Sequence, residues 1–219
     1  MVLDAAWTRR WIDLAARDLV EAKELLTELD RAIGDADHGV NMERGFLAVQ
    51  ACLADTAPES LATPGEVLKL AAMTLLATVG GAAGPLYGTA LLRAAKAVGT
   101  EELTATDVAQ MIVAGATGIE ERGKAKLGEK TMVDAWVPAA QAAEIAAAEP
   151  GASPQSVLAV AASAAEVGSI GTIDLLATKG RASYLGERSI GHEDPGARSS
   201  AIILQAASRA AQQGKEAAQ

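Results

Sequence analysis

The sequence predicts an all-α fold, an up-and-down antiparallel bundle or barrel of eight helices. Half of the 219 residues are apolar and only 3% are aromatic, a composition that favours closely packed helices over a strand-rich sandwich. Apolar residues recur at helical spacing along most of the chain, and no segment alternates apolar and polar residues as a half-buried strand does. A chain of this length suits one core, so we expect residues 1–219 to form a single domain.

The eight helices follow from apolar periodicity and from residues that start or stop a helix. The first is expected at residues 4–29, where apolar side chains recur in alternating steps of three and four. Thr63-Pro64-Gly65-Glu66 forms a capping box with proline in the first helical position, and Ser153-Pro154 repeats the capped start. The other helices are expected at residues 38 or 41 to 54, 64–79, 85–98, 104–122, 131–148, 154–177 and 199–213.

An antiparallel arrangement brings alternate connections to the same end of the bundle. The connections at one end hold ordinary cap and turn residues. Those at the other end are residues 30–37, the glycine turn 80–85, residues 123–130 and the long segment 178–198. We therefore expect every chemically unusual segment of the chain to meet at one end of the bundle.

The connection after the first helix concentrates carboxylates. Asp30, Asp35 and Asp37 lie close in sequence, and two ionised carboxylates about 5 Å apart repel by about 3 kcal/mol at an effective dielectric of roughly 20. A hard divalent cation would offset that repulsion, and oxygen-only ligands favour Mg²⁺, Mn²⁺ or Ca²⁺ over zinc. An EF-hand does not fit, because Val40 and Phe46 stand where glycine and glutamate are required. The alternative is a solvated loop in which Asp and Gly serve turn geometry.

The remaining unusual connections suit a phosphate group. The turn 80–84 could offer backbone N–H groups to an anion, or could simply break the helix. His38 and His192 could carry a phosphoryl group or bind a metal, but we prefer a hydrogen-bonding role for both. No nucleophile–base pair is evident, so we expect no covalently modified catalytic residue. The later loops also carry local positive charge, from Lys124, Lys126, Lys130, Lys179, Arg181, Arg188 and Arg198.

Charge and composition exclude several classes of partner. The net charge of −9 and the pI of about 4.8 argue against binding to nucleic acid or to a membrane surface. Cys52 is the single cysteine, and its place in an apolar helical stretch predicts a small core residue. The N-terminal residues show no signal-type apolar region, and glycine and proline interrupt the apolar run 70–86. We expect a cytoplasmic protein without a membrane span.

Four blocks in the unusual connections match a family signature. They are Leu29-Asp30 with Gly34-Asp35-Ala36-Asp37-His38-Gly39-Val40-Asn41-Met42, Gly80-Gly81-Ala82-Ala83-Gly84-Pro85-Leu86-Tyr87-Gly88-Thr89, Gly128-Glu129-Lys130-Thr131-Met132-Val133-Asp134, and residues 179–196 from Lys179-Gly180-Arg181 to Asp194-Pro195-Gly196. Through these blocks the chain resembles the ADP-binding L subunits (DhaL family) of bacterial dihydroxyacetone kinases over nearly its whole length.

The resemblance implies an eight-helix barrel with a nucleotide site at one end. It implies that ADP, or ATP when charged, stays bound with two Mg²⁺ ions held by Asp30, Asp35 and Asp37. Such a site acts by positioning and charge neutralisation. Ala83 stands where family members commonly have serine, and a lost hydrogen bond of about 1 kcal/mol would weaken nucleotide retention. The positions that the resemblance assigns to the ADP site are His38, Gly39, Val40, Asn41, Ala82, Ala83, Gly123, Met132, Arg181, Asp194, Pro195 and Gly196.

The resemblance also implies partner proteins. A phosphohistidine protein, the M subunit of the phosphoenolpyruvate-dependent phosphotransferase system, would recharge ADP, and the γ-phosphoryl group would pass to dihydroxyacetone held on the K subunit. Two alternatives stay open: the nucleotide domain of an ATP-dependent ketose kinase, and a non-catalytic ADP-loaded module that binds a transcription regulator. We expect segment 178–198 to fold over the nucleotide, with Arg188 and Glu193 either contacting a partner or bracing the segment.

Overall fold

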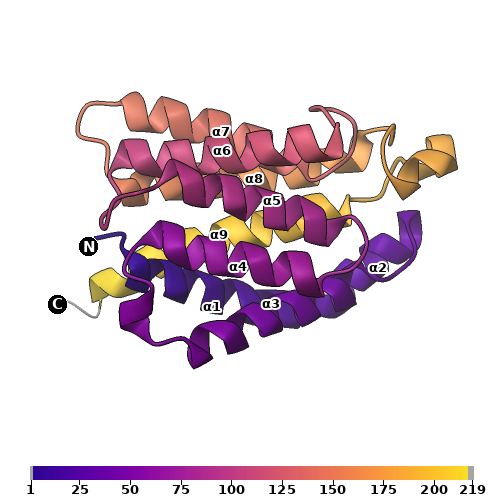
Figure 1. The fold of residues 1–219 in the computed structure, drawn as a ribbon. Coiled ribbons are helices and arrows are strands. Elements are labelled where there is room, and N and C mark those ends of the chain that lie inside the picture. The colour runs from indigo at the N-terminus through magenta and orange to yellow at the C-terminus, as the bar shows by residue number, and fades with distance from the viewer. Residues whose placement is uncertain (1, 217–219) are drawn as a thin grey trace.

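The computed structural model describes residues 2–216, and these residues confirm the all-α prediction (Figure 1). The only β feature in that part of the chain is an isolated bridge between Leu3 and Leu103. The α-helices are α1 (Ala5–Glu21), α2 (Lys23–Ile33), α3 (His38–Asp55), α4 (Pro64–Thr78), α5 (Ala83–Ala97), α6 (Ala105–Gly123), α7 (Val133–Ala148), α8 (Pro154–Gly171) and α9 (Pro195–Glu216). Three short 3-10 helices are η1 (Pro58–Ser60), η2 (Thr172–Asp174) and η3 (Arg181–Ser189).

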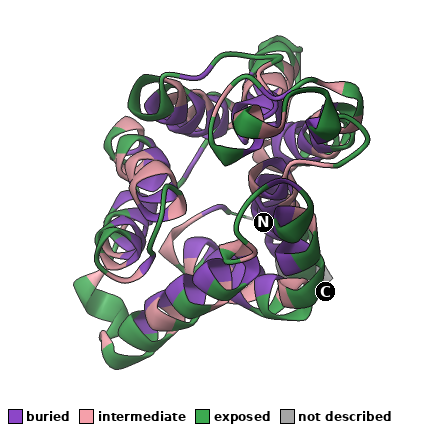
Figure 2. Cartoon of the chain, turned by 90° about the vertical axis from the view of Figure 1, so that its right-hand side faces the viewer, coloured by how far each residue is buried: buried purple, intermediate pink, exposed green. Residues whose placement is uncertain are grey.

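The helices pack in a closed ring. From α3 to α9 each α-helix packs against the next in the chain, α9 packs against α1, and α1 packs against α3. Figure 2 shows this ring from one end. Two tryptophans hold the contact between α1 and α9. Trp7 and Trp11 stack with their ring centroids 5.4 Å apart, and their indole N–H groups donate to the carbonyls of Ala207 and Ile203 at 3.2 and 2.8 Å. Buried aromatic area and satisfied N–H groups thus join the first helix to the last.

Three helix boundaries differ from the sequence prediction. The predicted first helix is interrupted at Ala22, whose ψ of 0° separates α1 from α2. The helix that begins at Pro154 ends at Gly171 and not near residue 177, because Thr172 starts a 3-10 turn. The last helix begins at Pro195, four residues before the predicted start, because the Asp194 carboxylate accepts the N–H of Ala197 at 2.7 Å and caps the helix there.

Cys52 is not a core residue as predicted. Its side chain is exposed, because α3 turns Phe46, Val49 and Leu53 toward the core and leaves position 52 on the outer face. The two predicted capped starts are present, since Thr63 accepts the N–H of Glu66 and Ser153 accepts that of Ser156. Pro154–Asp174 is apolar and long enough to span a membrane by composition, with a mean hydropathy of 1.5, but it packs within the ring against α7 and α9.

The four unusual connections lie at one end of the ring, as predicted. Figure 1 shows α2 and the segment between α8 and α9 at the right-hand end, with the start of α1 and the end of α9 at the opposite end. Figure 2 views the molecule from this right-hand side. The N-terminal ends of α3, α5 and α9 line a cavity at this end.

Candidate functional site

Two adjoining cavities lie at this end of the ring. The first, here called the polar cavity, has a volume of about 180 Å³. The second, the apolar cavity, has a volume of about 330 Å³ and shares Ala82, Thr131, Lys179 and Gly180 with the first. The apolar cavity is otherwise lined mainly by aliphatic side chains, including Leu86, Ile119, Ala125, Met132 and Val133. A charged compartment beside an apolar one suits a ligand that is polar at one end and flat or apolar at the other.

The polar cavity is built around a cluster of three carboxylates. Asp30, Asp35 and Asp37 each offer an oxygen, and these three oxygens lie within 4.8 Å of one another. Asp30 is buried in the last turn of α2, and its Oδ2 accepts the N–H groups of Asp37 and His38 at 2.8 and 3.1 Å. It therefore fixes the start of α3 against the end of α2. Gly34 is required beside it, because a Cβ there would lie 2.0 Å from Asp30 Oδ1.

These carboxylates fit a hard divalent cation. All three donors are oxygen atoms, the ligand type that Mg²⁺, Mn²⁺ and Ca²⁺ prefer. Ala36 between the second and third has a φ of +62°, a costly conformation for a residue with a Cβ, and it turns the chain so that the carboxylates converge. The only ion pair that the described residues form with this cluster joins Arg181 to Asp35 at 2.6 Å, so much negative charge remains for a cation to neutralise.

Two residues at the start of α3 are held in place from outside the cavity. His38 Nε2 lies 2.8 Å from Ser199 Oγ, and burial of the ring lowers the pKa of His38, although Asp30 and Asp37 act in the opposite direction. Asn41 Oδ1 accepts an N–H of Arg44 at 2.7 Å. The same guanidinium donates to the Thr78 carbonyl at the end of α4. Asn41 is thus oriented beside the glycine turn that follows α4.

Lys130 is a fully enclosed cation in the wall of the polar cavity. Its side chain is 1% exposed, and its ammonium group donates to the carbonyls of Thr172, Ile173 and His192. Burial lowers the pKa of Lys130, while nearby carboxylates, with Asp194 the largest, oppose that shift. Because the three carbonyls come from both ends of the segment between α8 and α9, Lys130 ties this segment to the loop before α7.

The loop before α7 is ordered by Asp134. Its two carboxylate oxygens accept the N–H groups of Gly128 and Thr131 at 2.5 and 2.7 Å. Gly128 and Lys130 both have positive φ, so the loop turns tightly here. This arrangement directs Thr131 and Met132 toward the two cavities, whose walls they form.

The segment between α8 and α9 covers the cavity from the side. Ala182 on η3 packs with Ile33 of α2 and with Ala177 in a small apolar cluster. Arg181, at the start of η3, reaches Asp35. η3 is thus attached to α2 by this apolar cluster and to the carboxylate cluster by one ion pair.

Glu193 braces this segment and is not free for a partner. Its carboxylate accepts from Ser169 at 2.6 Å and pairs with Arg198 at 2.8 Å. Arg198 also pairs with Glu166 on α8 at 2.7 Å. Of the two explanations predicted for Glu193, the structure therefore favours the bracing role, whereas Arg188 is exposed.

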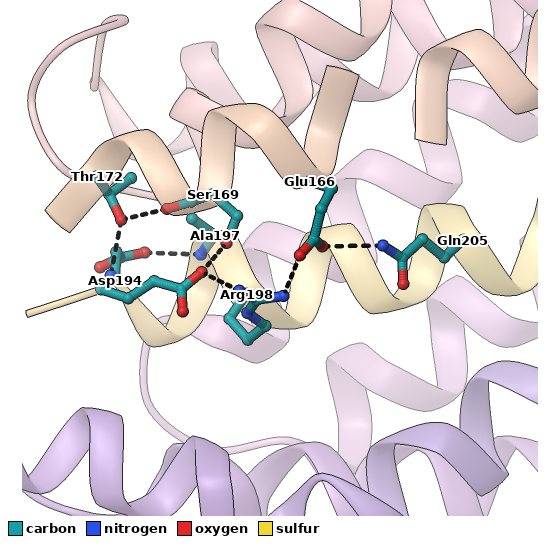
Figure 3. A network of polar contacts seen from close by, with 8 residues as sticks. Glu166, Ser169, Thr172, Asp194, Ala197, Arg198 and Gln205 are labelled. Carbon is teal, nitrogen blue, oxygen red and sulfur yellow. Dashed lines mark hydrogen bonds and ion pairs between the residues drawn. The ribbon is translucent and has the colours of Figure 1, made fainter. Parts of the chain in front are cut away.

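Asp194 joins this network to the cavity. Its N–H donates to Thr172 Oγ1 at 2.9 Å, and its carboxylate caps α9 (Figure 3). The pKa of Asp194 is raised to about 7, chiefly by burial and also by Asp134 and Asp30, although the capping N–H of Ala197 and Lys130 act in the opposite direction. Asp194 is therefore a buried carboxyl group that titrates near neutral pH.

The structure brings most of the residues assigned by resemblance to one place. Three do not line either cavity. A Cβ on Gly39 would lie 2.1 Å from the Lys23 carbonyl, so this glycine serves helix packing. The Val40 side chain is 42% exposed, and Gly196 presents its carbonyl to Tyr87. Lining the polar cavity are Asp30, Asp35, Asp37, His38, Asn41, Ala82, Ala83, Arg181, Asp194 and Pro195, and lining the apolar cavity are Ala82, Gly123 and Met132.

Sequence reasoning missed several residues of the site. Lys130 was counted only as a loop cation, although a lysine inside a Gly-rich turn before a helix can be buried by donating to carbonyls. Leu86 and Ile119 are ordinary helical apolar residues, and no local pattern separates a cavity wall from a core. Asp194-Pro195 repeats the cap-plus-proline signal of the other helix starts and could have placed α9 correctly.

Comparison with known proteins relates the chain to one family. The family described as the DAK2 domain matches residues 32–209. The chain is 46% identical to the ADP-binding subunit DhaL of PEP-dependent dihydroxyacetone kinase 1 from Listeria innocua, covering 94% of this chain and 96% of that one. It is also 46% identical to the corresponding DhaL subunit from Escherichia coli, with 94% and 95% covered.

Longer proteins contain a similar unit. Triokinase/FMN cyclase from Mus musculus is 36% identical over 89% of this chain, which spans 33% of that protein. The crystal structure of the dihydroxyacetone kinase of C. freundii matches with a TM-score of 0.71 and 22% identity, over 93% of this chain and 34% of that one. The same kinase in complex with AMP-PNP and Mg²⁺ matches with a TM-score of 0.68. At this identity the structural likeness supports the fold alone.

Proposed function

Because the chain belongs to the DAK2 domain family, and within it to the ADP-binding DhaL subunits, we propose that it is the nucleotide-binding phosphoryl-transfer subunit of a dihydroxyacetone kinase. The observation that carries this proposal is the convergence of three carboxylates, a glycine turn and Arg181 on one cavity, beside an apolar cavity at the same end of the ring.

The two cavities divide the nucleotide between them. The diphosphate belongs in the polar cavity, where Asp30, Asp35 and Asp37 would hold two Mg²⁺ ions. The adenosine belongs in the apolar cavity, against Gly123 and Met132. The Mg²⁺ ions supply charge neutralisation of the phosphates when bound.

The protein's own residues then position the phosphates. The backbone of the turn 80–83 leads into the N-terminal end of α5, and helix N-termini favour negative charge. Arg181 is 65% exposed and held by a single ion pair, so it can move from Asp35 to a phosphate at little cost. No side chain in this set needs to be covalently modified.

The function includes two partners. We propose that a phosphohistidine M subunit recharges bound ADP and that the γ-phosphoryl group passes to dihydroxyacetone on a K subunit. Both must reach the open end of the polar cavity. Tyr184 on η3, 88% exposed, and Leu127 in the loop before α7, 52% exposed, are exposed apolar side chains in two of the connections at this end of the ring. The 46% identity to DhaL subunits of PEP-dependent kinases, over nearly the whole of both chains, supports this mode. It also supports a cytoplasmic location.

Native mass spectrometry of freshly purified protein tests the proposal. The chain should appear at 22.3 kDa plus the mass of ADP and Mg²⁺, because a resident nucleotide survives desalting. A folded protein that carries no nucleotide and exchanges added ATP rapidly would contradict the resident mode. That result would favour the second candidate function, the nucleotide unit of an ATP-dependent ketose kinase. The 36% identity to a triokinase is the observation that supports this alternative.

A further inference from the structure

A line of buried hydroxyl groups leads from His38 into the core. His38 Nε2 lies 2.8 Å from Ser199 Oγ, and Ser199 Oγ lies 2.6 Å from Tyr87 Oη. Tyr87 is 2% exposed and Ser199 is fully buried. The three residues belong to α3, α5 and α9, the helices whose N-terminal ends line the polar cavity. Tyr87 and Ser199 are shielded from solvent, so their protons have few possible acceptors other than the groups described here.

These contacts allow one continuous chain of donors that ends on His38 Nε2. Ser200 Oγ lies 2.7 Å from the Gly196 carbonyl one turn earlier in α9 and 2.8 Å from Tyr87 Oη, so its one proton is shared between these two acceptors. Tyr87 has one proton, and its shortest contact is with Ser199 Oγ. Its contacts with Ser200 Oγ and the Gly196 carbonyl are longer, at 2.8 and 3.0 Å. When Tyr87 donates to Ser199, the shorter of the two contacts left for the Ser199 proton is His38 Nε2 at 2.8 Å, against the Gly196 carbonyl at 3.1 Å.

We propose that Tyr87 and Ser199 are positioning residues that fix His38 as the Nδ1–H tautomer, so that His38 presents a hydrogen-bond donor to the polar cavity. A neutral imidazole has one N–H group and one acceptor nitrogen. When Nε2 accepts from Ser199, the proton resides on Nδ1, the nitrogen left for a ligand. The described residues form no hydrogen bond with Nδ1.

This assignment gives His38 one role and excludes another. A ring N–H suits a phosphate oxygen, whereas a metal ion needs a ring nitrogen with a free lone pair. His38 therefore contacts a phosphate and leaves the cation to the carboxylates. The inference rests on the proposed function to the extent that the ligand is a nucleotide phosphate, but the tautomer itself does not depend on any ligand.

Nitrogen NMR of the imidazole rings tests the tautomer directly. The chain has two histidines, and His192→Gln identifies the signals of His38. In nucleotide-free protein we expect His38 to carry its proton on Nδ1. Tyr87→Phe removes the donor to Ser199, so a measurable fraction of His38 should change to the Nε2–H form. A wild-type ring protonated on Nε2 would overturn the inference, and this result needs no variant to fold.

Calorimetric titration with ADP in the presence of Mg²⁺ tests the consequence. Tyr87→Phe and Ser199→Ala should each weaken ADP binding about fivefold, the effect of one misdirected hydrogen bond. Ser199→Thr keeps the hydroxyl and should restore binding. Ser200→Ala is the matched control, because it deletes a buried hydroxyl that contacts Tyr87 but not His38.

The control separates positioning from packing. Equal losses in Ser200→Ala and Tyr87→Phe would mean that the hydroxyl cluster only stabilises the fold, and would overturn the inference. A wild-type protein that binds no ADP would instead contradict the proposed function, while the tautomer measurement would still decide the question of His38.

Discussion

At the scale of single residues, the site is a set of like charges held together by backbone. One carboxylate oxygen of Asp30 accepts the N–H groups of Asp37 and His38, so Asp30 both caps the start of α3 and is a candidate metal ligand. The sequence predicts the carboxylates because Asp-rich loops with glycine are locally visible. It does not predict the burial of Lys130, which depends on carbonyls more than forty residues away along the chain.

Replacing Asp37 by Asn tests the carboxylate cluster. The change removes one negative charge from an exposed loop residue and little apolar burial, so the helical fold should persist. ADP affinity in the presence of Mg²⁺ should fall by about tenfold or more, because hard cations bind carboxylates far better than amides. Calorimetry measures the affinity and circular dichroism the fold. Unchanged binding of ADP and Mg²⁺ would remove Asp37 from the ligand set.

Asp194 predicts a dependence of stability on pH in nucleotide-free protein. Burial raises its pKa from 3.8 to about 7 in the folded state, so between about pH 4 and 7 the folded chain holds a proton that the unfolded chain has lost. The contribution of Asp194 is therefore fully present below about pH 4 and declines as pH rises through 7.

The variant Asp194→Asn isolates this contribution, since asparagine still caps a helix. Denaturant unfolding of both proteins at pH 5 and pH 8 should show wild type losing stability relative to the variant as pH rises. A difference that is the same at both values, or that grows in favour of wild type at high pH, would be inconsistent with a buried protonated carboxyl.

At the scale of helices, close packing fixes the geometry of the site. Gly39 of α3 lies against α2, where a Cβ would also be 2.4 Å from Thr27 Oγ1. The sequence predicts both helices. The resemblance assigned Gly39 to the nucleotide site, because residues needed for helix packing and residues needed for binding lie in the same sequence block. The start of α9 is a second case in which one motif serves both packing and the site, because Asp194 caps the helix and also lines the polar cavity.

Gly39→Ala should therefore act on the site through helix packing. The added Cβ forces α3 away from α2 and moves Asp37 relative to Asp30, which should cost about 1–3 kcal/mol of unfolding free energy and weaken binding of ADP with Mg²⁺. Gly99→Ala is the control, because a Cβ there meets nothing within 4 Å. Urea unfolding and calorimetry report the two effects. If Gly39→Ala were as stable as Gly99→Ala, the packing role would be wrong.

At the scale of the whole molecule, the alternating direction of the helices brings the parts of the site together, which no single motif could do. A ring of antiparallel helices gathers four connections, distant in sequence, around one cavity. Helix order and connection length were enough to predict that gathering. The division into a polar and an apolar cavity was not predictable. It depends on which apolar side chains of α5 and α6 line a cavity and which pack in the core, and both kinds have the same helical spacing in the sequence.

One open end also implies that two partners compete for it. If phosphoryl groups enter and leave by the polar cavity, a K subunit and an M subunit cannot dock at the same time. Excess unphosphorylated M subunit should therefore slow transfer to dihydroxyacetone on the K subunit, in a continuous assay of product formation. Simultaneous binding of both partners to one chain, measured by analytical ultracentrifugation, would rule out a shared face.

The most direct test of the proposed nucleotide site is a measurement of ADP binding with and without Mg²⁺. Protein is stripped of nucleotide and metal, then titrated with ADP in a calorimeter in excess Mg²⁺ and again in excess chelator. We expect one ADP per chain in Mg²⁺ and at least about tenfold weaker binding in chelator, because three carboxylates repel a diphosphate unless cations bridge them. Binding of equal strength in both conditions, or no binding in either, would contradict the proposed site.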